Sequence, residues 1–478
     1  MILSFLRKCY KTSKGRIYNM NQQLNDWIDL HRNDIIEALS SLIQCPSVKS
    51  TEVSEEMPFG KGIADALDFM MSLAGKYGFT SKNLDGYAGF IESEPYGEEL
   101  IGILTHLDVV PAGEGWSFDP FGGTIENGRL YGRGTMDDKG PAIAAFFAML
   151  ALRECQIPLS RRLRLIMGCD EESGLTCIDH YCKTEEIPTM SFSPDADYPL
   201  VNSEKNIYHA FYECSFSSDL TIQCGERVNI VPLTATAVVP FEQDEVFTLV
   251  DKPMKKIGFE YKLSPVEAGT RIEVFGKASH SSHPENGKNA LQALFYLLTL
   301  LPLKGKDHDL IHLLYDMFKL EYNGESLGLC REDESGNLTL NVGVMHWTRE
   351  GFEMQIDVRA PLSVTREEIE GTINNRIAGS GIICGSKTKF VDGLYVPEDS
   401  ELVVKLLGAY RDFTGDFRPP IKIGGGTYAR KLPNAVAFGI EFPEKGSVMH
   451  MPDEYIDIDD LILDTKILAH AMMALATI

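Results

Sequence analysis

Two adjacent carboxylates, Asp137 and Asp138, stand in the glycine-rich stretch 132–141 of this chain. A carboxylate has two oxygens, so an aspartate held in a rigid turn can bind two cations at once. Histidine nitrogens and carboxylate oxygens are the usual ligands of a catalytic zinc ion. Residues of both types occur in other segments of the chain: His106, Asp108, Glu171, Glu172, Asp195 and His450. Together they favour a two-metal hydrolytic site that Asp137 bridges.

Each of these signals also has an ordinary structural explanation. A His-x-Asp triplet is common on surfaces and in cores, and a double acid in a turn is often a solvated bend. Glu171 and Glu172 could begin a helix, where acids favour the dipole. Asp195 and His450 could be isolated loop residues. We favour the metal site because all of these residues occur in one chain and follow predicted strands or turns.

The elements that position these residues alternate between strands and helices. Short apolar runs predict buried strands at 100–105, 163–167, 189–192 and 435–438. Amphipathic or apolar periodicity predicts helices at 21–44, 61–78 and 141–153, the last opened by Pro141. This alternation predicts an α/β fold with a doubly wound, largely parallel sheet. Ligands in such folds bind at the carboxyl ends of the strands, and several of the candidate residues directly follow predicted strands.

The pattern changes near residue 202 and returns near residue 392. Between them, residues 206–275 carry strand-like runs, 287–303 predicts a helix, 338–344 and 352–358 predict a hairpin, and 365–377 predicts a helix. Helices at 400–414 and 459–476 then resume the α/β pattern. We therefore predict a catalytic domain that is split by an inserted α+β lid domain. The predicted boundaries are an N-terminal extension at 1–19, a first catalytic segment at 20–202, the lid at 203–392 and a second catalytic segment at 393–478.

The composition excludes several partners. The formal net charge of −24 argues against nucleic acid and against an anionic membrane surface. The longest apolar stretch, 290–303, is too short to span a bilayer. Ten cysteines without a C-x-x-C motif indicate a reducing compartment, and residues 1–8 lack the order of a secretory signal. We therefore expect a cytoplasmic protein.

A set of short motifs resembles the co-catalytic zinc peptidases related to aminoacylase, carnosinase and glutamate carboxypeptidase. The residues of these motifs are most similar to those of the PepV-like dipeptidases, and the resemblance runs from about residue 21 to the end of the chain. The motifs stand at 106–111, 131–141, 170–174, 194–197, 229–232, 276–280, 357–361, 424–428 and 449–454.

The resemblance implies a role for each candidate in the catalytic domain. His106, Asp137 and Asp195 would bind one zinc ion, and Asp137, Glu172 and His450 would bind a second, with manganese as the alternative metal. A hydroxide would bridge the two ions. Asp108 would orient His106, and Glu171 would be the general base. The peptide bond between Asp137 and Asp138 would be cis.

Within the lid, the resemblance implies residues that hold the substrate. Asn229 and His280 would stabilise the oxyanion, although His283 and His346 are alternatives on sequence grounds alone. Arg359 and the loop Gly425-Gly426-Thr427 would bind the substrate carboxylate. Arg359 could instead pair with an acid of the lid.

The leading prediction is therefore a di-metal dipeptidase that cleaves unsubstituted dipeptides. A deacylase of N-acyl or N-succinyl amino acids on the same scaffold is the alternative, and a non-catalytic binding protein that keeps the fold is a third. The resemblance further implies a doubled lid, which favours a monomer whose partner is a small peptide substrate.

Overall fold

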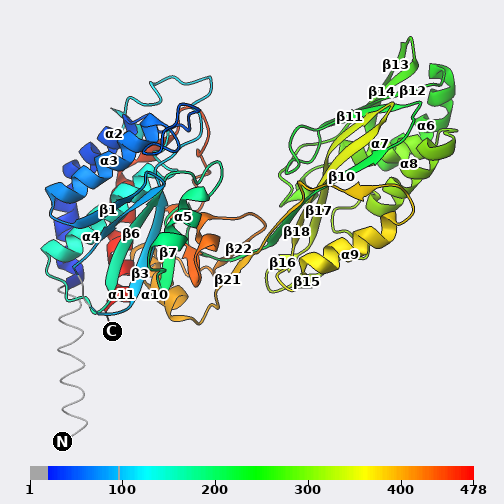
Figure 1. Cartoon of the computed structure of the whole chain (residues 1–478). Coiled ribbons are helices and arrows are strands. Elements are labelled where there is room, and N and C mark those ends of the chain that lie inside the picture. The colour runs from blue at the N-terminus through cyan, green and yellow to red at the C-terminus, as the bar shows by residue number, and fades with distance from the viewer. Residues whose placement is uncertain (1–19, 95–96, 478) are drawn as a thin grey trace, which may run out of the picture. The chain divides into compact units, whose positions relative to one another are not determined.

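The computed structural model of the chain describes residues 20–94 and 97–477 (Figure 1). The predicted extension 1–19 lies outside the described residues. The chain divides into two compact units. Unit 1 comprises Met1–Asn202, Tyr395–Ile421 and Thr427–Ile478, and unit 2 comprises Ser203–Leu394 and Lys422–Gly426. Among the described residues, every helix is too short or too polar to cross a membrane.

Unit 1 is built on a mixed sheet whose central strands are parallel. The strand order is β1 (Thr80–Leu84), β2 (Ala88–Glu92), β6 (Arg162–Gly168), β3 (Leu100–His106), β7 (Met190–Ser193), β23 (Ala435–Ala437), β9 (Val201–Glu204) and β21 (Leu394–Tyr395). β3 runs parallel to β6 and β7, and β23 runs parallel to β7. Every residue of β3 is buried, as expected for a central parallel strand covered on both faces. The predicted α/β class and the four strands are confirmed.

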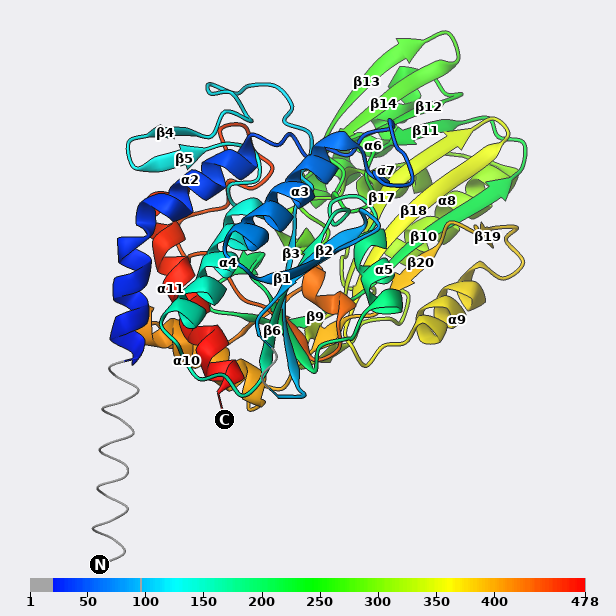
Figure 2. The same cartoon turned by 60° about the vertical axis from the view of Figure 1, so that its left-hand side comes forward.

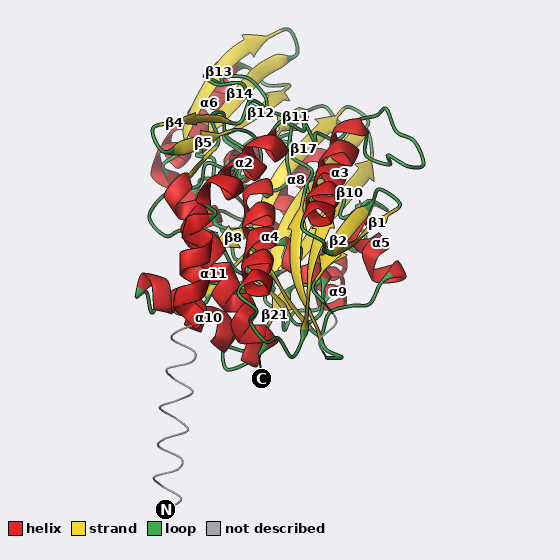
Figure 3. Ribbon diagram, turned by 90° about the vertical axis from the view of Figure 1, so that its left-hand side faces the viewer, coloured by secondary structure: helices red, strands yellow, loops and turns green. Residues whose placement is uncertain are grey.

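Helices flank this sheet (Figure 3): α2 (Arg32–Ile43), α3 (Lys61–Lys76), α4 (Lys139–Glu154), α5 (Thr176–Thr184), α10 (Glu401–Thr414) and α11 (Ile458–Ala476). α4 contacts β3, β6, α2 and α11, and α3 contacts β1 and β2 (Figure 2). Because its sequence is apolar on all sides, α4 is buried almost throughout.

Two helix predictions need correction. α4 begins at Lys139, so Pro141 is its third residue, although it still lies in the first turn, where no backbone donor is needed. The predicted helix 21–44 is interrupted at residue 31, between helical residues 20–30 and α2. The His31 ring stacks on Trp27, and its Nδ1 lies 2.8 Å from the Trp27 carbonyl oxygen. The backbone of His31 departs from helical geometry, with φ −97 and ψ 14, although its N–H still donates to the Trp27 carbonyl at 3.1 Å.

Two small sheets fasten the C-terminal segment to the loops of unit 1. In one, β25 (Tyr455–Asp457) pairs with β5 (Arg129–Tyr131), which pairs with β4 (Thr124–Glu126). In the other, β24 (Ile440–Glu441) runs parallel to β8 (Ala196–Asp197). The short helix η2 (Tyr428–Lys431) packs against β3, β7 and β23.

Unit 2 is an antiparallel sheet covered by helices. Its strands are, in order, β13 (Glu260–Val266), β14 (Gly269–Phe275), β12 (Thr234–Val239), β11 (Thr221–Cys224), β17 (Thr339–Thr348), β18 (Gly351–Ala360), β10 (Asn206–Ser215) and β19 (Ile383–Cys384), and β20 (Lys389–Val391) also pairs with β10. The helices are α6 (Gln243–Ile257), α7 (Ala290–Thr299), α8 (Gly305–Phe318) and α9 (Arg366–Ile377). Burial alternates along β10, as expected when one face of a sheet packs on the core.

The predicted hairpin is confirmed by β17 and β18, and the predicted helix 365–377 by α9. The strand-like runs predicted in 206–275 are confirmed by β10 to β14, but the prediction missed α6, which lies among them. This helix buries Val246, Val250 and Met254, which recur every four residues along one side but are few among polar residues.

Candidate metal centre

The candidate ligands lie where strands and turns of unit 1 end. His106 is the last residue of β3. Asp137 stands in the turn between β5 and α4, Glu172 follows β6, Asp195 follows β7, and His450 lies in the loop between β24 and β25. Because the ends of β3, β6 and β7 are neighbours in the sheet, residues far apart in the sequence meet at one edge.

The structure brings the ligands together as two groups that share Asp137. In the first, His106 Nε2 lies 2.9 Å from Asp137 Oδ1 and 3.4 Å from Asp195 Oδ2. In the second, His450 Nε2 lies 3.0 Å from Asp137 Oδ2 and 3.1 Å from Glu172 Oε1. The ligand atoms of each group lie within 4.8 Å of one another. Each oxygen of Asp137 therefore faces a different group, as a bridging ligand requires.

The donor atoms fit divalent metal ions. His106 Nε2 and Asp137 Oδ1 are buried, yet neither makes a hydrogen bond of good geometry within the described chain. Ligands at roughly 2.0–2.1 Å from a tetrahedral zinc lie about 3.3 Å from one another, and the measured separations are close to that value. Imidazole and carboxylate ligands suit zinc, and they also suit manganese.

The electrostatics also indicate missing positive charge. Burial alone would lower the pKa of His106, but the carboxylates of Asp108, Asp137 and Asp195 raise it well above its usual value. Contacts with Asp137 and Glu172 raise the pKa of His450 to about 10. Burial, reinforced by Asp137, raises the pKa of Asp195 to about 6. The carboxylates of this site thus favour the charged forms of His106 and His450, and bound cations would supply positive charge in the same place.

Asp108 makes different contacts from those expected. Its backbone carbonyl oxygen, rather than its carboxylate, lies 3.0 Å from His106 Nδ1, and the carboxylate is 3.6 Å from that nitrogen. The carboxylate instead accepts the backbone N–H groups of Glu171 and Glu172, at 3.0 and 3.1 Å. Asp108 therefore orients His106 through its main chain and the two glutamates through its side chain.

Glu171, the candidate base, belongs to neither ligand group. Burial raises the pKa of its carboxyl to about 8. Asp138, the residue after Asp137, was given no role from the sequence. It is fully buried, and its Oδ2 accepts the His106 backbone N–H at 2.9 Å. The Asp137–Asp138 peptide bond is cis, as the resemblance implied.

In unit 2, the segments of Asn229 and His280 lie side by side. Ile230 and His280 form an antiparallel bridge, and the Ser281 N–H donates to the Asn229 carbonyl at 2.9 Å. Of the alternative histidines, His283 contacts Glu285 at 3.3 Å. His346 is bound to Gln223 on β11 at 2.9 Å.

Arg359 does pair with an acid of its own unit, the alternative left open by the sequence. Its Nε and Nη2 donate to the Asp357 carboxylate at 2.7 and 2.8 Å, and Nη1 donates to the Gly424 carbonyl at 3.0 Å. A guanidinium has five N–H groups, so two have no partner among the described residues. Gly425 and Gly426 belong to unit 2, whereas Thr427 belongs to unit 1.

Asp357 connects Arg359 to the His280 segment, and sequence reasoning missed this role. The Ser281 hydroxyl donates to Asp357 Oδ2 at 2.5 Å, and His209 Nε2 lies 3.3 Å from the same oxygen. Burial would raise the pKa of Asp357, but His209 and Arg359 hold it at about 2. Two sequence signals were available: Asp357 is the first residue of the motif 357–361, and it stands two residues before Arg359 on one strand face.

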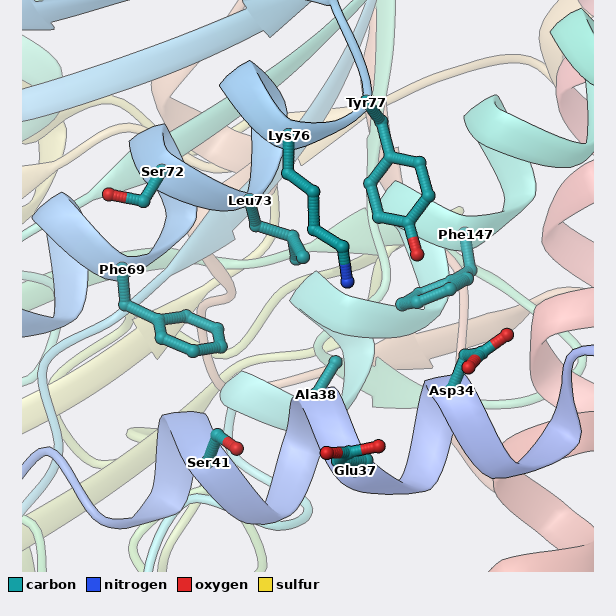
Figure 4. Close-up of a pocket in the computed structure, with 10 residues that line it drawn as sticks. All are labelled: Asp34, Glu37, Ala38, Ser41, Phe69, Ser72, Leu73, Lys76, Tyr77 and Phe147. Carbon is teal, nitrogen blue, oxygen red and sulfur yellow. The ribbon is translucent and has the colours of Figure 1, made fainter.

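A separate cavity of unit 1 lies between α2, α3 and α4 (Figure 4). Lys76 and Tyr77 point into it opposite Asp34 and Glu37. The ten residues that line it include none of the candidate ligands, so this cavity is separate from the two ligand groups.

Comparisons with known proteins identify the family to which this chain is similar. The chain matches the model of "Peptidase family M20/M25/M40" over residues 102–474. It is 38% identical over 459 residues to "Putative dipeptidase YtjP" of Bacillus subtilis (strain 168), covering 93% of this chain and 98% of the relative. It is 34% identical over 461 residues to "Putative dipeptidase SH1171" of Staphylococcus haemolyticus, covering 93% and 97%.

Solved structures show the same fold. Human carnosine dipeptidase 1 matches with a TM-score of 0.55 at 14% identity, over 96% of this chain and 99% of that one. The di-peptidase Dug1p of Saccharomyces cerevisiae matches with a TM-score of 0.57 at 15% identity, over 95% and 98%. The resemblance drawn from the sequence motifs is confirmed at the level of the family. The chain belongs to peptidase family M20/M25/M40, a family of metallopeptidases.

Proposed function

We propose that this protein is a dipeptidase that cleaves the peptide bond of unsubstituted dipeptides and uses two zinc ions. The observation that carries the proposal is the division of Asp137 between two ligand groups, with one oxygen at 2.9 Å from His106 and the other at 3.0 Å from His450. Similarity to relatives named as dipeptidases along nearly their whole length supports the substrate class.

His106, Asp137 and Asp195 would hold one ion, and Asp137, Glu172 and His450 the other. When bound, such ions polarise a peptide carbonyl and lower the pKa of a water molecule enough for attack at neutral pH. Three ligand carboxylates against two divalent cations leave one positive charge, which favours a negatively charged nucleophile at the centre.

Glu171 would be the general base. A base must accept a proton from the attacking water and return it to the leaving amine. Burial keeps the pKa of Glu171 near neutrality, within the range that suits both transfers. Its backbone N–H donates to the Asp108 carboxylate, which fixes the main chain at Glu171, next to the proposed ligand Glu172.

Unit 2 would act as a lid that supplies substrate contacts. Burial and the nearby Arg359 lower the pKa of His280, so a neutral imidazole could donate an N–H to the oxyanion, together with the Asn229 side chain. The two free N–H groups of Arg359, with the loop Gly425-Gly426-Thr427, would bind the substrate carboxylate.

We further propose that the protein is a cytoplasmic monomer. The net charge of −24 gives no support to a nucleic-acid partner. Sedimentation of the purified protein at several concentrations tests the monomer: a mass that doubles as the concentration rises would contradict it.

The function is tested by turnover on a matched panel of substrates. After a chelator has removed bound metal, zinc or manganese is restored, and a dipeptide, its N-acetyl form and a tripeptide are compared. We expect rapid cleavage of the dipeptide alone. Faster cleavage of the N-acetyl form would favour the deacylase. Metal binding without turnover of any substrate would favour a binding protein that keeps the fold.

A further inference from the structure

Glu454 is a buried carboxylate close to the proposed centre but outside both ligand groups. It lies in the same loop as His450, immediately before β25, and none of its surface is exposed. A buried charge is costly unless hydrogen-bond donors surround it. Its partners therefore indicate what Glu454 holds in place.

Among the described residues, the groups that donate hydrogen bonds to the Glu454 carboxylate come from the turn that carries Asp137. Glu454 Oε1 accepts the backbone N–H groups of Gly134 at 3.0 Å, Met136 at 2.9 Å and Asp137 at 3.4 Å. Glu454 Oε2 accepts Nη1 of Arg133 at 2.6 Å. One side chain thus binds three backbone amides and one guanidinium, all within residues 133–137, and this fixes the path of the backbone there.

The strand pairing of unit 1 explains how Glu454 reaches this turn. β25 and β5 are antiparallel, with Tyr455 opposite Tyr131. The Gly132 N–H continues the pairing by donating to the Glu454 carbonyl at 2.9 Å. Glu454 is therefore held against residues that precede it by about 320 positions.

Arg133 extends the same network to the loop of His450. Its side chain is buried and also donates to the carbonyls of Met451 at 3.4 Å and Ala112 at 3.3 Å. The loop needs such support, because His450 has φ 61 and Asp453 has φ 57, in the left-handed region that non-glycine residues rarely adopt.

We infer that Glu454 is a positioning residue of the metal centre, which locks the Asp137 turn and the His450 loop into one arrangement. Asp137 must direct its two oxygens to different ligand groups, and metal sites tolerate displacements of only about 0.5 Å. Glu454 meets this requirement by fixing the backbone on the N-terminal side of Asp137. The inference rests on the metal roles of Asp137 and His450 in the proposed function.

The test is the zinc affinity of Glu454→Gln, measured on the purified apo-protein by competition with a chromophoric chelator. Glutamine has one oxygen, which can serve the three turn amides or Arg133 but not both. Loss of a residue that orients a ligand typically weakens metal binding about 10–100-fold, and we expect that range here. Asp453→Asn is the matched control. It removes the same charge from the preceding residue, whose carboxylate instead accepts the backbone N–H groups of Ser117 and Phe118, and it should leave the affinity unchanged.

Two further variants separate the outcomes. If Asp137→Asn binds zinc as tightly as the wild type, the proposed centre and this inference both fall. If Asp137→Asn loses zinc while Glu454→Gln retains wild-type affinity, the inference alone is overturned. Should Glu454→Gln not fold, Arg133→Lys decides, because lysine keeps the charge but cannot also reach the two carbonyls. A loss of several-fold would support the inference, and wild-type affinity would overturn it.

Discussion

Replacing Asp357 with asparagine should weaken binding of substrates that carry a free carboxylate. Asp357 uses two oxygens to hold Arg359 and receives the Ser281 hydroxyl as well. Asparagine offers one oxygen and one amide, so at least one bond to Arg359 becomes a contact between two donors. A hydrogen bond to a charged group contributes about 1.5–3 kcal/mol, and a tenfold change in affinity corresponds to about 1.4 kcal/mol. The expected loss is therefore roughly 10- to 100-fold.

The assay compares KM and kcat for a dipeptide and for its C-terminal amide. In Asp357→Asn, KM for the dipeptide should rise by that factor, while KM for the amide, which lacks the charge that Arg359 would bind, should change little. Glu353→Gln, which neutralises an exposed acid on the same strand, is the control. Equal rises for both substrates would refute the reasoning, because a general loss of structure does not distinguish a carboxylate from an amide.

Three other predictions concern the base, the lid and the core. Glu171→Gln should retain its metal by elemental analysis while losing about 10²–10⁴-fold in turnover; loss of metal would show that Glu171 is a ligand. His280→Ala should lower turnover by roughly 10²–10³-fold with unchanged metal content, and near-normal turnover would leave the lid a structural role. Burial raises the pKa of Asp464, which accepts the Tyr198 hydroxyl at 2.6 Å, to about 7. Because the folded pKa exceeds the unfolded value of 3.8, the contribution of this carboxyl to stability is complete below that value and is lost as the pH rises towards 7. Urea unfolding of Asp464→Asn should therefore show a flatter decline in stability between pH 4 and 7 than the wild type, and an unchanged slope would contradict the assignment.

The strands of unit 1 could be predicted because their sequences carry a strong local signal. The run 100–105 is continuously apolar, and such a run suits a strand buried on both faces. α6 could not be predicted in the same way. Its sequence is largely polar, and its apolar side consists of only three buried residues, Val246, Val250 and Met254. These residues recur every four positions, as in a helix, but valine, phenylalanine and threonine in the same segment are also typical of strands. Tertiary packing, rather than local propensity, decides such a segment.

Some residues of the candidate site could be predicted from the sequence, and others could not. Ligands could be proposed from residue type and motif, since metal binding requires particular side-chain atoms. The contacts of Asp108 with the Glu171 and Glu172 amides could not be predicted from the sequence. Nearly every residue has a backbone donor, and only the fold decides which of them a carboxylate meets. Asp357 was missed for the same reason, since its partner Ser281 lies on another segment.

Unit 1 is assembled from three separate stretches of chain, and this determines when, during synthesis, its proposed metal centre can form. β23, an internal strand of the sheet, and His450 both lie in the last stretch. A ribosome must therefore translate the whole of 203–394 before it makes either of them. Domains fold as units during synthesis, but unit 2 also includes Lys422–Gly426. Both units are therefore completed only after residue 421 has been made, and until then the first stretch of unit 1 lacks β23 and the candidate ligand His450. The proposed metal centre is therefore completed only when this last stretch of the chain has been made.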